Sequence, residues 1–248
     1  MLAGNVGYLQ IPPVSGYKGW YDASVSSSIT SSAGAVSQWN DLSGYGYHLT
    51  QATGAYKPIT NVTTQNGKNV LNFTNVSSLK AATASDWTFT NNGTGCTFFI
   101  AVKTTGTGFT VYLSTNSVSQ TPAGFAFYTN TTSKLIYFNQ ATIVNTSANN
   151  ATVSGTFAYL TNVTDPTNGT ASQRTGIQYN QTTIIRNNTA TTAVVGSTPD
   201  RPLALGDYDA AGASGINGSV AEVIFYPSTL SGANILLVQQ YLAAKWAL

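Results

Sequence analysis

Short apolar segments recur along this chain, and Asn, Gly, Thr and Pro separate them. Several are rich in β-branched and aromatic residues, which suit the pleated, half-buried surface of a sheet. Short segments of this kind with turn residues between them are typical of β-sandwiches and barrels. The segments that we predict to be strands are 17–22, 36–39, 69–74, 96–103, 109–114, 124–128, 134–139, 155–163, 175–179, 182–186, 202–206 and 218–226.

One segment near the end of the chain has the spacing of a helix instead. The apolar positions Ile235, Leu236, Val238, Leu242 and Trp246 include several pairs at helical spacing, and Ser231 before them is a suitable N-cap. We therefore predict an all-β, antiparallel sandwich with one C-terminal α-helix that plugs one end or edge of the sandwich. The large apolar side chains that we assign to its core are Trp20, Trp39, Phe73, Phe99, Phe225 and Trp246.

The beginning of the chain differs from the rest. Pro12 and Pro13 favour an extended backbone, so we predict an extended N-terminal arm over residues 1–16 and one sandwich domain over residues 17–248. The arm has no basic segment followed by an apolar one, the pattern of an export signal. No apolar stretch approaches the roughly 18 residues of a membrane-spanning helix.

Charge is sparse and evenly spread. Charged residues make up 7% of the chain, and no two of its ten Lys and Arg residues are adjacent. Because phosphate binding needs clustered cations, we expect neither nucleic acid nor a membrane surface as a partner. The single cysteine, Cys96, excludes an intrachain disulfide and fits a small buried core residue.

Residues that transfer protons are scarce. The chain has one His, His48, and one Glu, Glu222. Most glycosidases need two positioned carboxylates, a Ser-His-Asp triad would depend on His48, and a zinc site would have one His and one Cys to draw on. We therefore predict that the chain is not an enzyme, and that Glu222 is a hydrogen-bonded structural carboxylate.

Two Asp residues are candidates for a calcium site. Asp207 and Asp209 lie in one Gly-rich loop, and Ca²⁺ prefers several carboxylate and carbonyl oxygens. Paired Asp residues are also common in turns, where they cap the backbone. We predict no other cofactor.

Tyrosines in Gly-rich loops are candidates for ligand contact. Tyr45, Tyr47 and Tyr208 have the flat rings that stack on sugars, beside Asn and Asp groups that form hydrogen bonds. The alternative is that they pack locally or touch a protein neighbour. The chain also has twelve Asn-x-Ser/Thr sequences, which are glycosylated only in a host that has the machinery.

Two stretches resemble the LamG-like family of concanavalin A-like jelly-roll domains. The first is Gly19-Trp-Tyr-Asp-Ala-Ser24 followed by Val36-Ser-Gln-Trp-Asn-Asp-Leu-Ser-Gly44, and the second is 218–226 with the helix after it. The resemblance implies a jelly roll that binds or builds more often than it catalyses. Related glucanases have a pair of Glu residues on one strand, whereas here Ile224 stands two places after Glu222. Relatives also have an Asn-Gly hairpin where this chain has Asn180-Gln181, so we expect a longer or irregular hairpin.

Two functions are compatible with these features. Our first prediction is a virion structural protein, a capsid decoration protein or a tail or fibre component on the virion surface. The arm would bind other virion proteins, because an extended arm is ordered when a neighbour holds it, and the chain would form a homo-oligomer or symmetric assembly. The alternative is a carbohydrate-binding or adhesin module of a secreted or cell-surface protein, with host glycans as partners.

Overall fold

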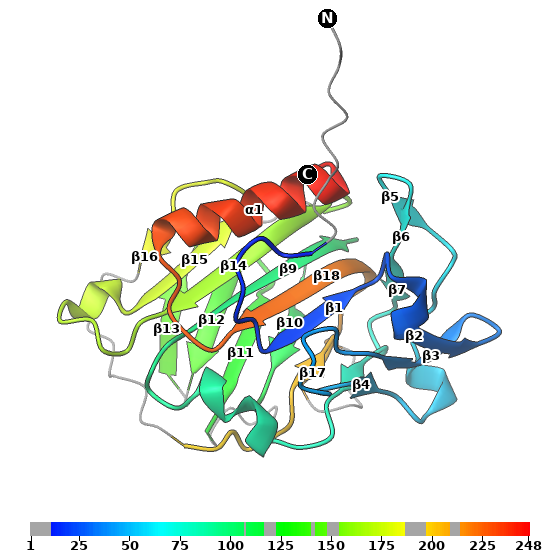
Figure 1. Cartoon of the computed structure of the whole chain (residues 1–248), viewed down its shortest axis with the longest axis horizontal. Coiled ribbons are helices and arrows are strands. Elements are labelled where there is room, and N and C mark those ends of the chain that lie inside the picture. Colours follow the sequence, from blue (N-terminus) through cyan, green and yellow to red (C-terminus); the bar gives the residue numbers. More distant parts are fainter. Residues whose placement is uncertain are drawn as a thin grey trace, which may run out of the picture.

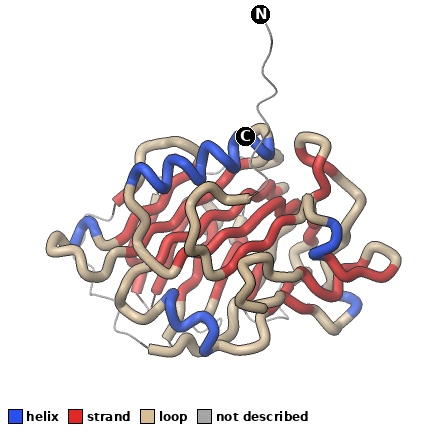
Figure 2. The backbone as a smooth tube through the Cα atoms, viewed as in Figure 1, coloured by secondary structure: helices blue, strands red, loops and turns tan. Residues whose placement is uncertain are grey.

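The computed structural model describes residues 11–106, 108–116, 123–139, 142–147, 154–186, 197–208 and 214–248. In these residues two antiparallel sheets face each other, and a single α-helix runs along the outside of one of them (Figures 1 and 2). The prediction of an all-β sandwich with one C-terminal helix is confirmed. No helix in the described part of the chain is long and apolar enough to cross a membrane.

The first sheet has seven strands and carries the helix. Its order is β1-β18-β9-β14-β15-β16. β7 pairs with the beginning of β18, and β1 pairs with the later residues of that strand. The strands are β1 (Gly19–Asp22), β7 (Leu71–Phe73), β9 (Cys96–Thr104), β14 (Ala158–Thr164), β15 (Thr175–Tyr179), β16 (Ile185–Arg186) and β18 (Gly218–Tyr226).

The second sheet has nine strands in the order β13-β12-β11-β10-β17-β8-β4-β3-β2. The strands are β2 (Ile29–Ser32), β3 (Ala35–Trp39), β4 (Leu49–Thr50), β8 (Leu79–Lys80), β10 (Thr110–Ser114), β11 (Phe125–Thr129), β12 (Leu135–Asn139), β13 (Thr142–Thr146) and β17 (Ala204–Leu205). A separate hairpin joins β5 (Thr64–Gln65) and β6 (Lys68–Asn69). The short 3₁₀ helices are η1 (Ser26–Ser28), η2 (Gly54–Tyr56), η3 (Ser85–Thr90) and η4 (Ala171–Gln173).

The main core lies between the two sheets. Phe98 of the first sheet packs on Phe125 and Tyr137 of the second and on Phe225 of its own sheet, with the Phe98 and Phe125 ring centroids 5.3 Å apart. The buried thiol of Cys96 belongs to the same cluster, and burial raises its pKa. The core role predicted for six large side chains is confirmed, since Trp20, Trp39, Phe73, Phe99, Phe225 and Trp246 are all buried.

The helix α1 (Gly232–Trp246) covers a face of the first sheet, so the prediction that it plugs an end or edge is wrong. Val238, Leu242 and Trp246 form a second apolar cluster with Phe99 of β9 and Tyr226 of β18. The physical reason is that these strands carry apolar side chains on both faces, and the outward-facing set needs a cover. Ser231 is the N-cap, as predicted, and its side chain accepts a hydrogen bond from the Asn234 N–H.

The hairpin between β15 and β16 is longer than a two-residue turn, as the Asn180-Gln181 sequence predicted. The last paired residues are Ile177 and Ile185, and Asn180 takes the left-handed conformation with φ 49°. The Asn180 carbonyl oxygen Oδ1 accepts a hydrogen bond of 3.0 Å from the Tyr159 N–H. The loop is thereby bonded to the sheet at Asn180, and its later residues, 182–184, lie near the first turns of α1.

Candidate functional site

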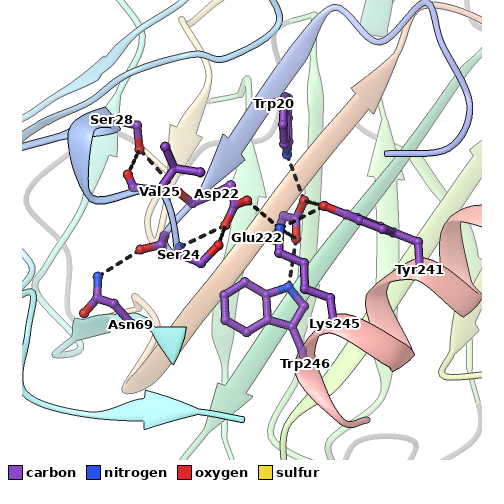
Figure 3. Close-up of polar contacts among 11 residues, drawn as sticks. Trp20, Asp22, Ser24, Val25, Ser28, Asn69, Glu222, Tyr241, Lys245 and Trp246 are labelled. Carbon is purple, nitrogen blue, oxygen red and sulfur yellow. Dashed lines mark hydrogen bonds and ion pairs between the residues drawn. The ribbon is translucent and has the colours of Figure 1, made fainter. Parts of the chain in front are cut away.

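A fully buried ion cluster lies beneath the C-terminal end of α1 (Figure 3). Asp22 of β1 and Glu222 of β18 are paired across the two strands, and Lys245 of α1 reaches both carboxylates. The Lys245 Nζ lies 2.9 Å from Glu222 Oε2, and all three side chains are 0–1% exposed. The ammonium offsets the repulsion that two buried carboxylates would otherwise exert on each other.

Every oxygen of Glu222 has at least two partners. Oε1 accepts hydrogen bonds from Trp20 Nε1 at 2.8 Å and the Tyr241 hydroxyl at 2.7 Å, and Oε2 accepts one from Trp246 Nε1 at 2.8 Å beside the Lys245 ion pair. Burial is the main cause that raises the pKa of Glu222, Asp22 raises it further, and Lys245 lowers it. The cluster is closed and saturated, so the structural role predicted for Glu222 is confirmed.

Two Asp residues of the segments that resemble the LamG-like family, Asp22 and Asp41, also form structural hydrogen bonds. Asp22 also accepts hydrogen bonds from the Ser24 N–H at 2.9 Å and its hydroxyl at 2.6 Å. Asp41 accepts hydrogen bonds from the backbone N–H groups of Trp20, Ser43 and Tyr47, at 3.0, 2.9 and 3.2 Å. Asp41 thereby protects the edge of β1 and fixes the loop that follows.

That loop presents the tyrosines predicted to contact a ligand. Tyr45 is 56% exposed, and its ring lies 5.7 Å from that of Tyr47 and 5.5 Å from the Lys18 Nζ. Tyr47 is half-buried and packs on Trp87, with the ring centroids 5.8 Å apart. Of these two rings, Tyr45 is the one free to stack on a sugar.

The other predicted site residues lie elsewhere. Tyr208 is buried on the outer face of the second sheet, where its ring stacks at 6.1 Å on that of Phe109, and the adjacent Asp207 is buried as well. Asp209 lies outside the described residues. No group of three or more His, Cys, Asp or Glu residues comes together in the described ranges. Calcium binding at Asp207 and Asp209 stays a prediction.

An open cleft, which the sequence did not reveal, lies at the other end of α1. Its volume is about 380 Å³, and it separates the first turns of the helix from β14, β15 and β16. The lining residues are Val163, Asp165, Asn168, Gln173, Gln178, Thr182, Thr183, Ile184, Arg186, Thr229, Leu230, Gly232, Ile235, Leu236 and Gln239.

The cleft combines apolar walls with amide, hydroxyl and charged groups. Leu236 contributes an apolar surface that is 44% exposed. Gln239 donates a hydrogen bond of 2.8 Å to the Gln178 Oε1, which fixes one amide in the wall. Arg186 donates one of 2.7 Å to the Gln173 carbonyl oxygen. A concave site with apolar walls and a few fixed polar groups is typical of small-molecule binding.

Comparisons with known proteins identify the fold. No family model matches the chain, and no curated protein matches it. A Trypanosoma rangeli sialidase structure is similar with a TM-score of 0.62 and 14% identity, over 94% of this chain and 33% of that one. An arabinofuranosidase complexed with arabinofuranosyl-α-1,2-xylobiose has a TM-score of 0.61 and 14% identity, over 95% of this chain and 60% of that one.

A carbohydrate-binding domain is also similar. The CBM40 of a Ruminococcus gnavus IT-sialidase, bound to α2,3-sialyllactose, has a TM-score of 0.51 and 13% identity, over 68% of this chain and 95% of that one. This chain spans about a third of the length of the sialidase. At such identities the likeness shows a shared fold alone, an antiparallel β-sandwich. It does not single out the LamG-like or concanavalin A-like family, so that resemblance stays a prediction.

These neighbours correct one prediction. We expected no enzyme activity because the chain has one Glu and one His. Sialidases and an arabinofuranosidase, which are glycoside hydrolases, nevertheless have domains of this fold. The expectation rested on the carboxylate pair that most glycosidases use, whereas sialidases have a Tyr nucleophile and are an exception. Residue counts therefore do not exclude glycosidase activity, and the prediction that the chain is not an enzyme is corrected.

Proposed function

We propose that this chain is a carbohydrate-binding module and that it holds its glycan in the cleft beside the first turns of α1. The observation that carries the proposal is this open, partly polar cleft on a fold shared with sialidase, arabinofuranosidase and CBM40 chains. The virion role that we predicted first has no support among these neighbours. The extracellular or cell-surface location stays a prediction that fits the proposal.

The two ends of α1 differ in their capacity to take a ligand. At the C-terminal end Asp22, Glu222 and Lys245 are 0–1% exposed and already bonded to one another, which leaves no room for a sugar. At the N-terminal end Leu236 is 44% exposed, and Gln173 and Thr183 are exposed as well. Hydrogen-bonding groups that face solvent are available to a ligand.

The lining of the cleft suits the two faces of a sugar. Pyranose rings have an apolar face of C–H groups and a rim of hydroxyl groups. Leu236 and Ile184 provide apolar surface for the first, while Gln173, Gln178 and Asn168 provide amide groups for the second. Amides both donate and accept hydrogen bonds, as sugar hydroxyls require.

A pair of neighbouring leucines tests the location. Leu236 lines the cleft and is 44% exposed, whereas Leu237 does not line it and is 47% exposed. We expect the purified chain to bind glycans on an array, and Leu236→Ala to weaken the binding of the best one about fivefold or more, as the loss of an apolar contact of ~1–2 kcal/mol requires. Leu237→Ala should leave it within twofold.

Tyr45→Ala tests whether the glycan binds at the exposed Tyr45 ring, which the sequence suggested, instead of in the cleft. If Tyr45→Ala abolishes glycan binding and Leu236→Ala does not, the glycan stacks on the Asn40–His48 loop and the proposed location is wrong. If the chain binds no glycan on a broad array, at millimolar concentrations by NMR, the proposed function is wrong.

A further inference from the structure

Arg186 has an unusual environment for a cation. It is the last residue of β16, lines the cleft and is half-buried. Within the described ranges its guanidinium donates one hydrogen bond, from Nη1 to the Gln173 carbonyl oxygen at 2.7 Å. Among the described residues the ion pairs are Arg201 with Asp200 and Lys245 with Asp22 and Glu222, and none includes Arg186.

The nearest acidic group does not neutralise Arg186. Asp165 lines the same cleft, but its carboxylate accepts hydrogen bonds from the Thr167 hydroxyl at 3.1 Å and the Asn168 amide at 3.0 Å. Partial burial lowers the pKa of Arg186. The charge of Asp165 raises this pKa, but its effect is the weaker of the two. Over the residues that the structure describes, Arg186 thus loses hydration without gaining an ion pair, and most of its five N–H donors have no partner there.

The beginning of α1 adds positive potential to the same cleft. Gly232, the first residue of this 15-residue helix, is part of the lining, and the first turn contains no acidic residue. The backbone N–H groups at a helix N-terminus carry partial positive charge. Arg186 and the beginning of α1 therefore favour an anionic group inside the cleft, whereas the Asp165 carboxylate in the same lining opposes one.

We infer that the cleft selects a sugar that bears a carboxylate, which pairs with the Arg186 guanidinium while the rest of the ring lies against Leu236. The planar guanidinium matches a carboxylate through two parallel N–H···O hydrogen bonds. The inference rests on the proposed function and narrows it from glycans in general to acidic sugars.

Matched glycan pairs test the inference. The probes are oligosaccharides that end in glucuronic acid beside the same oligosaccharides that end in glucose, and α2,3-sialyllactose beside lactose. We expect the acidic member of at least one pair to bind roughly 10- to 100-fold more tightly in calorimetric titration, the range for a charge-assisted hydrogen-bond pair. The preference should decrease as salt is added.

Variants assign the preference to Arg186. Arg186→Gln should reduce the ratio of acidic to neutral affinity to less than threefold. Arg186→Lys keeps the charge but not the paired donors, and should retain part of the preference. Arg201→Gln is the control, because it removes the same charge from a residue outside the cleft. Unchanged circular dichroism would show that each variant is folded.

The outcomes separate the inference from the function beneath it. Equal binding of neutral and acidic glycans in the cleft would overturn the inference and leave the carbohydrate-binding function in place. Tighter binding of sulfated lactose than of every carboxylated probe would also overturn it, since the group recognised would then be a sulfate. Absence of binding to any glycan would overturn both.

Discussion

A cation lies beside each end of α1, but the two cations differ in burial and in their hydrogen-bond and ion-pair partners. At the C-terminal end Lys245 is 1% exposed and lies between two carboxylates, each of which has further hydrogen-bond donors. At the N-terminal end Arg186 lines a cleft, and in the described part of the chain it donates one hydrogen bond, to the Gln173 carbonyl oxygen. One cation completes a closed network, and the other is available to a partner from outside the chain.

The difference shows how polar groups beside the two ends of one helix divide between stability and recognition. A buried charge must have partners within the protein, because the desolvation penalty otherwise exceeds any gain. A cation at the wall of a cleft keeps part of its hydration and can exchange water for a ligand. The closed end therefore fixes α1 on the sheet, and the open end is the place to look for binding.

The largest effect is expected from Lys245→Met. The substitution keeps the apolar length of the side chain but leaves Asp22 and Glu222 buried opposite each other without a cation. Breaking a buried ion pair on one side costs about 3–5 kcal/mol of unfolding free energy, measured by urea denaturation at pH 7. Lys57→Met, at a half-buried position outside the cluster, should change it by about 0.5 kcal/mol or less.

The Lys245→Met variant should also regain stability in acid. Without Lys245, burial and Asp22 raise the pKa of Glu222 and nothing charged opposes them. The folded state then binds a proton at a pH where the unfolded chain, with a Glu pKa of about 4.3, does not. Stability relative to the parent should therefore rise as the pH falls from 7 toward about 4.5. A gap that widens on acidification would contradict the role assigned to Lys245.

A smaller loss is expected from the two indole donors. Trp20→Phe and Trp246→Phe each remove one N–H group that donates to Glu222, to opposite oxygens and at the same distance of 2.8 Å. A hydrogen bond to a charged group contributes about 1.5–3 kcal/mol, and we expect the two variants to lose similar amounts. Thermal unfolding of both proteins measures this. Both should still bind glycan, since neither residue lines the cleft.

Much of the fold could be predicted because local patterns determine it. All twelve predicted strand segments overlap a strand of the structure, among them β9 and β18, where nearly continuous apolar runs match burial on both faces. The N-cap of α1 was also evident from Ser231 and the apolar spacing after it. Strands such as β2 were missed because Ile29–Ser32 is largely polar and exposed.

The cleft could not be predicted, because no local pattern marks it. Its residues come from β14, the β15–β16 hairpin and α1, and each looks ordinary in its own segment. Their proximity depends on where the helix lies, and that was predicted incorrectly. The sequence did contain a signal for the buried ion cluster. Val238, Leu242 and Lys245 are at helical spacing, so Lys245 falls on the buried face of α1. A lysine in that position requires a buried carboxylate partner.

The smallest expected effect is that of Arg186→Gln on the unfolding free energy, which compares the cation at the cleft with the buried Lys245. We expect Arg186→Gln to change the unfolding free energy by about 0.5 kcal/mol or less, as for a surface substitution, because Arg186 has no ion pair within the described residues. Urea denaturation beside Arg201→Gln measures this. A loss of about 2 kcal/mol would show that Arg186 is a structural cation like Lys245. The two ends of α1 would then differ in exposure but not in role, and the acidic sugar would need another partner in the cleft.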